Sequence, residues 1–192
     1  MMLPIDIRPD KLSEEMLDFS RKLGKGMENL LNADKIDTGV SPRDPVYRED
    51  KLVLYRYRAP EGVKRNPVPM LIVYALVNRP YMVDLQEDRS LVRQLLARGH
   101  DIYLIDWGYP GPTERWVTLD DYINSYISNC VDAICEKQGL DQINLLGICQ
   151  GGAFSLCYTA LHPEKIKNLI TMVTPVNFHV QGTAGCGLLN TW

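Results

Sequence analysis

Histidine is scarce in this sequence, with three copies among 192 residues. Cysteine occurs five times, which is an odd number. No short Cys-x-x-Cys pair and no Cys/His spacing typical of a zinc site occurs, so we expect no metal centre. Three of the cysteines, Cys130, Cys135 and Cys157, fall inside helical patterns, where free cysteine is usually a small buried apolar residue.

No charge sign dominates the chain and no long apolar run interrupts it. Lys plus Arg total 21 and Asp plus Glu total 24, so nothing suggests a nucleic-acid partner. The longest apolar run, residues 70–77, is shorter than the roughly 20 residues that a membrane-spanning helix needs. The first residues lack the basic-then-apolar layout of a signal peptide. We therefore expect a cytoplasmic protein with no membrane span.

The hydrophobic pattern from residue 51 onward alternates between strands and helices. Strands are expected over residues 51–58, 69–77, 101–106, 142–147 and 165–173, and helices over 88–99, from 118 to about 134, and 150–161. Thr118 and Asp121 resemble a capping box at the start of the second of these helices. Apolar strands alternating with helices predict an α/β protein whose mostly parallel sheet carries helices on both faces.

Ahead of this pattern, residues 11–32 carry apolar side chains at the spacing of an amphipathic helix, with Asp10 as the expected cap. Two interpretations remain open. The helix either packs on its own domain or offers a contact surface to another chain or to a polymer granule.

The most informative motif is Gly147-Ile148-Cys149-Gln150-Gly151, which joins an expected strand to an expected helix. This is the nucleophile-elbow pattern Gly-x-Ser-x-Gly with Cys in place of Ser. The turn is so sharp that Gly147 and Gly151 are needed to keep side chains out of the crowded space beside it. Cys149 would also lie at a helix N-terminus, which favours a thiolate. The alternative is a glycine-rich turn with a passive cysteine.

An acyl-transfer site also needs donors for the oxyanion. In this kind of site they are the N–H after the nucleophile and one N–H from the loop after the first buried parallel strand. These positions correspond to Gln150 and to Val77, with Asn78 as the second choice for the loop donor. An ordinary strand-to-helix loop is the other interpretation of residues 77–81.

None of the three histidines is well placed to act as the base. His162 follows a helix that would separate it from the elbow by roughly 18 Å at 1.5 Å per residue, and His100 precedes a strand. His179 follows a strand but comes too early for the usual order of nucleophile, acid and base. Asp106 ends another strand, and we interpret Asp106 and Trp107 as a structural or pocket-lining turn and not as the site of the triad acid. Asn78 is a further possible pocket residue.

Several strings together resemble the catalytic subunit of polyhydroxyalkanoate synthases, with the two-subunit class III type most similar. They are Leu145 to Ala153, Val73 to Met82, Tyr103 to Gly108, Val173 to Val176 and Ile5 to Leu12. The resemblance covers residues 3–178, blurs over 180–187 and returns at 188–192. It implies an α/β-hydrolase fold, ending here after the strand that follows the nucleophile helix. It divides the chain into an N-terminal helical appendage (1–40), the first part of a catalytic domain (41–178) and the divergent start of a cap region (179–192).

The resemblance also implies a reaction. Cys149 would carry the acyl group of a (R)-3-hydroxyacyl-CoA as a thioester and pass it to a growing polyester chain. No cofactor is needed, since coenzyme A is only the leaving group. The family's catalytic Asp and His lie beyond residue 192, so the chain is expected to be inactive alone. A second synthase subunit, a homo-oligomer and association with polyester granules are implied as well.

Two other functions stay open from the residues alone. One is a Cys-nucleophile esterase similar to dienelactone hydrolase, which would release free acid. The other is an inactive chain that serves only as a binding module.

Overall fold

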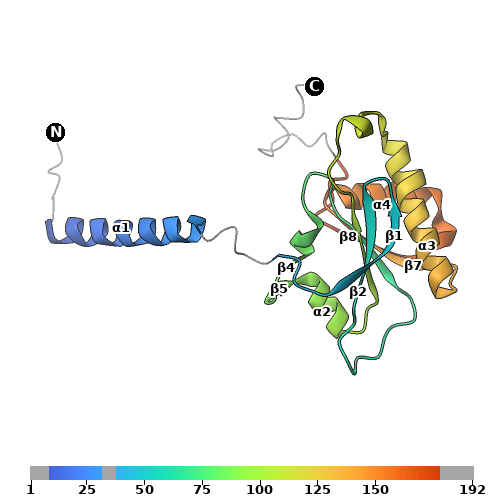
Figure 1. Cartoon of the computed structure of the whole chain (residues 1–192), viewed down its shortest axis with the longest axis horizontal. Helices are drawn as coiled ribbons and strands as arrows, with labels where there is room; N and C mark the ends of the chain where they lie inside the picture. Colours follow the sequence, from blue (N-terminus) through green and yellow to red (C-terminus); the bar gives the residue numbers. More distant parts are fainter. Residues whose placement is uncertain (1–8, 32–37, 178–192) are drawn as a thin grey trace. The chain divides into compact units, whose positions relative to one another are not determined.

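The computed structural model describes residues 9–31 and 38–177, which fall in two units divided after Asp37 (Figure 1). The described part of the first unit is one helix, α1 (Pro9–Leu31). It begins at Pro9, so Asp10 lies in its first turn and is not the cap that the sequence predicted; proline suits a first helical position. The side chains of Met16, Phe19 and Leu23 are all more than half exposed. Residues 179–192, expected to begin a cap region, lie outside the described residues.

The second unit is built on a six-stranded sheet. Its strands are β1 (Arg43–Glu49), β2 (Leu52–Tyr57), β3 (Met70–Val73), β6 (Ile102–Asp106), β7 (Ile143–Ile148) and β8 (Ile166–Met172). The spatial order is β1-β2-β6-β3-β7-β8. The β3, β6, β7 and β8 strands pair in parallel, whereas β1 and β2 pair antiparallel to their neighbours. The carboxyl ends of the parallel strands therefore meet at one edge.

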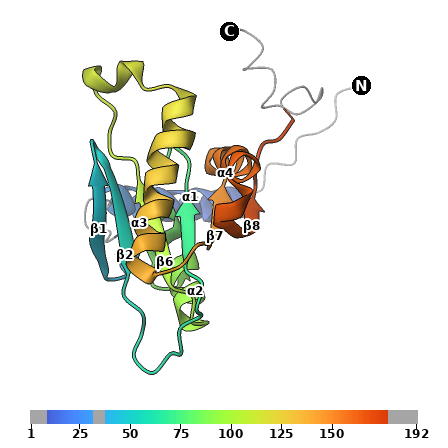
Figure 2. The ribbon, with the colours of Figure 1, turned by 90° about the vertical axis from the view of Figure 1, so that its right-hand side faces the viewer.

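Helices cover both faces of this sheet, which confirms the predicted α/β architecture (Figure 2). On one face, α2 (Leu91–Ala97) packs Val92 and Leu96 against the sheet. On the other face lie α3 (Ser128–Gln138) and α4 (Gln150–Leu161). Alternate residues of β3 divide between the two cores, as a pleated strand requires: Leu71 packs with α3 and α4, and Ile72 with α2. No helix within the described residues is long and apolar enough to cross a bilayer.

The connections differ from the sequence prediction in two places. The strand expected over 69–77 ends at Val73, and residues 74–79 form an irregular loop before the 3-10 turn η2 (Pro80–Val83). A hairpin of β4 (Asp84–Gln86) and β5 (Arg89–Ser90) delays the helix expected from residue 88. That helix starts at Leu91 because the Ser90 side chain caps it, accepting from the Arg93 N–H at 2.9 Å.

The segment after β6 contains the 3-10 turn η3 (Pro112–Trp116) and the π-helical turn η4 (Asp121–Ile127), which continues into α3. The predicted capping box is confirmed. The Thr118 N–H donates to Asp121 Oδ2 at 2.7 Å, and the Asp121 N–H donates to Thr118 Oγ1 at 3.3 Å. A last 3-10 turn, η5 (Pro163–Lys165), leads into β8.

Candidate active site

Cys149 lies at the turn between β7 and α4, at the carboxyl edge of the sheet. Its backbone has φ +55° and ψ −125°, in the positive-φ region that residues other than glycine rarely adopt. Such a conformation costs on the order of 1–3 kcal/mol and persists only where surrounding structure holds it. Two backbone hydrogen bonds do so: the Cys149 N–H donates to the Met172 carbonyl of β8, and its carbonyl accepts from the Gly152 N–H, both at 2.9 Å.

The glycines beside Cys149 lie in space that no side chain can enter. A Cβ on Gly147 would lie 2.5 Å from the Gly152 Cα, and one on Gly151 would overlap the Val73 carbonyl oxygen. Gly152, which the sequence analysis did not single out, is as restricted, because a Cβ there would overlap the Thr174 side chain. The elbow is therefore packed against the end of β3 on one side and the segment after β8 on the other.

The loop after β3 is tied to the first residue of α4. The Leu76 N–H donates to Gln150 Oε1 at 3.1 Å. This places residues 74–79 beside the elbow, where Val77 is 80% exposed and Asn78 is also exposed. Sequence reasoning considered only the backbone N–H of Gln150 and missed its side chain. The oxyanion roles of Gln150 and Val77 stay predictions.

Asp106 shapes the loop after β6, and Trp107 attaches that loop to the same region. Asp106 Oδ1 accepts from the Gly108 N–H at 3.0 Å, which closes the turn after β6. Trp107 Nε1 donates to the Tyr74 carbonyl at 3.0 Å. Its ring lies edge-on to Tyr122, with centroids 5.3 Å apart, and to Phe154 of α4, with centroids 6.5 Å apart. Trp107 thus connects three loops or helices around the elbow.

A cavity of about 120 Å³ lies beside Trp107, and we call it the Trp107 cavity. Asp106 and Asn78 are not among its lining residues. Those residues are Asp50, Lys51, Leu52, Leu76, Trp107, Gly108, Pro110, Glu114, Val117, Tyr122 and Tyr126. The β1–β2 turn and the loop after β6 therefore enclose a space that the sequence analysis anticipated only through Trp107.

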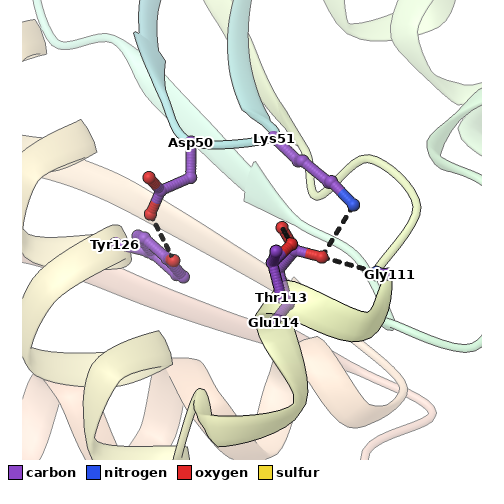
Figure 3. Close-up of polar contacts among 6 residues, drawn as sticks. All are labelled: Asp50, Lys51, Gly111, Thr113, Glu114 and Tyr126. Carbon is purple, nitrogen blue, oxygen red and sulfur yellow. Dashed lines mark hydrogen bonds and ion pairs between the residues drawn. The ribbon is translucent and has the colours of Figure 1, made fainter.

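The charged groups around this cavity are paired with one another (Figure 3). Lys51 Nζ contacts Glu114 Oε2 at 2.7 Å, and the Gly111 N–H donates to the same oxygen at 2.5 Å. Lys51, with help from Thr113 and Gly111, lowers the pKa of Glu114 to about 2. The Tyr126 hydroxyl donates to Asp50 Oδ2 at 2.8 Å, and this bond raises the pKa of Tyr126 to about 12.

The described histidines lie away from the elbow. His100 precedes β6, at the amino end of that strand, and its Nδ1 lies 3.3 Å from Asn66 Nδ2. His162 follows α4, whose 12 residues span roughly 18 Å at 1.5 Å each. Its Nε2 lies 3.2 Å from Asn124 Oδ1. His179 lies outside the described residues.

The helical cysteines differ from one another in burial. Cys130 is buried, which raises the pKa of its thiol, and Cys135 is partly buried. Cys157 is exposed on α4, so the prediction that it is buried was wrong. Helical periodicity alone did not tell which face of α4 it occupies.

Comparison with known proteins identifies the relatives of this chain. A family described as "alpha/beta hydrolase fold" matches residues 68–184. The Poly(3-hydroxyalkanoate) polymerase subunit PhaC of Allochromatium vinosum is 67% identical over all 192 residues, which cover 53% of that protein. The Poly(3-hydroxyalkanoate) polymerase subunit PhaC of a Synechocystis species is 56% identical over 181 residues, or 91% of this chain and 48% of that one. The resemblance noted from the sequence is thereby confirmed, and the chain spans about half the length of these relatives.

Among solved structures, the Francisella virulence factor BioJ matches with a TM-score of 0.56 over 84% of this chain and 53% of its own. The sequence identity is 15%, so this match supports the fold alone.

Proposed function

The chain belongs to the α/β-hydrolase fold family, and on that premise we propose that it supplies the nucleophile of a poly(3-hydroxyalkanoate)-forming acyltransferase. The observation that carries the proposal is Cys149 at φ +55°, on the turn between β7 and α4, with glycines on both sides. The high identity to polymerase subunits supports the same function. The substrate class is (R)-3-hydroxyacyl-CoA, with a growing polyester as the second substrate.

In the first step, the Cys149 thiolate attacks the thioester carbonyl carbon of the substrate. A new carbon–sulfur bond forms to Sγ, the bond to coenzyme A breaks, and coenzyme A leaves and takes up a proton. One thioester replaces another, so the exchange is nearly isoenergetic. No cofactor takes part, since coenzyme A is the leaving group.

In the second step, the hydroxyl oxygen of another 3-hydroxyacyl unit attacks the acyl group on Cys149. The hydroxyl proton passes to a general base, the bond to Sγ breaks, and the polyester is one unit longer. We place this base and its carboxylate partner outside the described residues. Attack by an alcohol in place of water requires a site that limits water access.

The oxyanion of each step is assigned to the backbone N–H groups of Gln150 and Val77, with Asn78 as the alternative to Val77. The contact between the Leu76 N–H and the Gln150 side chain supports this assignment, because it holds the loop after β3 beside α4. Gly147 and Gly151 allow the turn, and Asp106 and Trp107 shape the adjoining loop.

The proposal extends to assembly. The relatives are named polymerase subunits, which supports assembly with other subunits, and the proposed partners are a second synthase subunit and further copies of this chain in a homo-oligomer. The exposed apolar side chains of α1, among them Met16, Phe19 and Leu23, suit contact with another chain or with a polyester granule in the cytoplasm.

The test is to incubate the complete natural polypeptide with labelled 3-hydroxybutyryl-CoA and to map the labelled peptide. We expect label on Cys149 alone. Cys149→Ala should abolish polymer formation with the fold intact, and Cys149→Ser should be poor, because a hydroxyl is a much weaker nucleophile. Label on Cys130 or Cys157 with Cys149 unmodified would refute the mechanism. Release of free 3-hydroxy acid would identify an esterase, and no acylation at all would leave a binding module.

A further inference from the structure

The Trp107 cavity has an apolar interior of defined size. Leu52, Leu76, Trp107, Val117 and Tyr122 contribute its apolar walls. At about 120 Å³ it is somewhat smaller than an engineered cavity of about 150 Å³ that binds benzene. A short alkyl group fits such a space, whereas a nucleotide does not.

The charged groups at the cavity already have partners, which sets the chemistry of an occupant. Lys51 pairs with Glu114, and Asp50 accepts from Tyr126. These two contacts join the β1–β2 turn to the segment after β6 (Figure 3). An occupant gains no unpaired charge from them, so the cavity favours an uncharged, apolar group.

The walls of the cavity are shared with the elbow. Leu76 lines the cavity, and its backbone N–H donates to the side chain of Gln150, the residue next to Cys149. Trp107 lines the cavity and packs against Phe154, one turn into α4. The loop that carries Leu76 and the ring of Trp107 thus join the cavity wall to the first turn of α4, which follows Cys149.

We propose that the Trp107 cavity receives the alkyl substituent on C3 of the 3-hydroxyacyl unit and so limits its length. The assignment rests on the proposed acyltransferase function and specifies the substrate class of that site. Val117 is the residue chosen to test the length limit, because it lines the cavity and lies in the segment between η3 and η4, outside the elbow.

The test uses the complete natural polypeptide and measures coenzyme A release from 3-hydroxybutyryl-CoA and 3-hydroxyvaleryl-CoA, which differ by one methylene. A methylene in a hydrophobic pocket is worth about 10–200-fold in kcat/KM. Val117→Phe should therefore lower the ratio of kcat/KM, valeryl over butyryl, by about tenfold or more. Val117→Ala should raise the same ratio, so the two variants predict opposite shifts.

The matched control is Leu119→Phe, which adds bulk two positions away on a side chain that is 57% exposed and does not line the cavity. Its ratio should equal that of the wild type. If Val117→Phe does not fold, the test rests on Val117→Ala, in which the valeryl-over-butyryl ratio of kcat/KM should rise.

The outcomes distinguish a failure of the cavity assignment from a failure of the proposed acyltransferase function. An active enzyme whose ratio stays the same in both Val117 variants overturns the cavity assignment and leaves the acyltransferase standing. A wild type that releases no coenzyme A from either substrate overturns both.

Discussion

The backbone N–H of Leu76 donates a hydrogen bond to the side-chain oxygen Oε1 of Gln150, 3.1 Å away and 74 positions later in the sequence. The contact joins the loop after β3 to the first turn of α4. It therefore determines where Val77 lies relative to Cys149, and it makes the Gln150 side chain a positioning group for the proposed oxyanion site.

Removing that acceptor should slow the reaction without greatly weakening substrate binding. For Gln150→Ala we expect kcat to fall on the order of 10²-fold, as small misplacements of a reacting group can cause, while KM changes little. Gln150→Glu keeps an acceptor oxygen and should retain most of the activity. Steady-state kinetics of coenzyme A release measure both. Equal losses in the two variants would show that the oxygen does not position the loop.

The elbow glycines should resist substitution for steric reasons. In Gly151→Ala the new methyl group meets the Val73 carbonyl, and in Gly147→Ala it meets the Gly152 Cα. Overpacking typically costs about 1–3 kcal/mol, so urea denaturation should show a lower midpoint for both. Gly26→Ala in α1 is the control, because nothing lies within 4 Å of its Cβ position. A wild-type midpoint in Gly151→Ala would contradict the packing.

The Lys51–Glu114 contact should make the stability of the folded protein depend on pH. The pKa of Glu114 is lowered from 4.5 to about 2 in the folded protein. Its carboxylate therefore stabilises the fold fully above about pH 4.5, and this contribution is lost as the pH falls toward 2. The difference in denaturation midpoint between the wild type and Glu114→Gln should shrink over that range. A difference that does not vary with pH would mean that the ion pair contributes nothing.

The 192-residue chain expressed alone should be acylated once on Cys149 but should not release coenzyme A steadily. Neither described histidine lies near the elbow, and general-base help is typically worth 10²–10⁴-fold. The edge strand β8 also exposes Ile170 and Met172, and exposed apolar edges promote aggregation. Sustained turnover by a soluble monomer would contradict this prediction and would make His179 the first residue to examine.

Local patterns in the sequence were enough to predict most of the parallel part of the sheet. The elements β6, β7, α4 and β8 lie within one or two residues of their predicted bounds, because continuous apolar runs and glycine breaks define them locally. By contrast, β1 was not predicted. Its residues, Arg-Asp-Pro-Val-Tyr-Arg-Glu, have little apolar character and become a strand by pairing with β2 at the edge of the sheet.

The sequence by itself determined that Cys149 stands between two glycines at a strand-to-helix junction, since that pattern is local and sterically demanding. Only the tertiary structure decided what surrounds it. The Gln150 side chain meets Leu76, and Trp107 meets Tyr74 and Phe154, through contacts between residues 33 to 74 positions apart. The Trp107 cavity likewise depends on bringing the β1–β2 turn to the segment after β6. Periodicity reports which face of an element is apolar, but which elements meet is decided by the packing of the whole sheet and its helices.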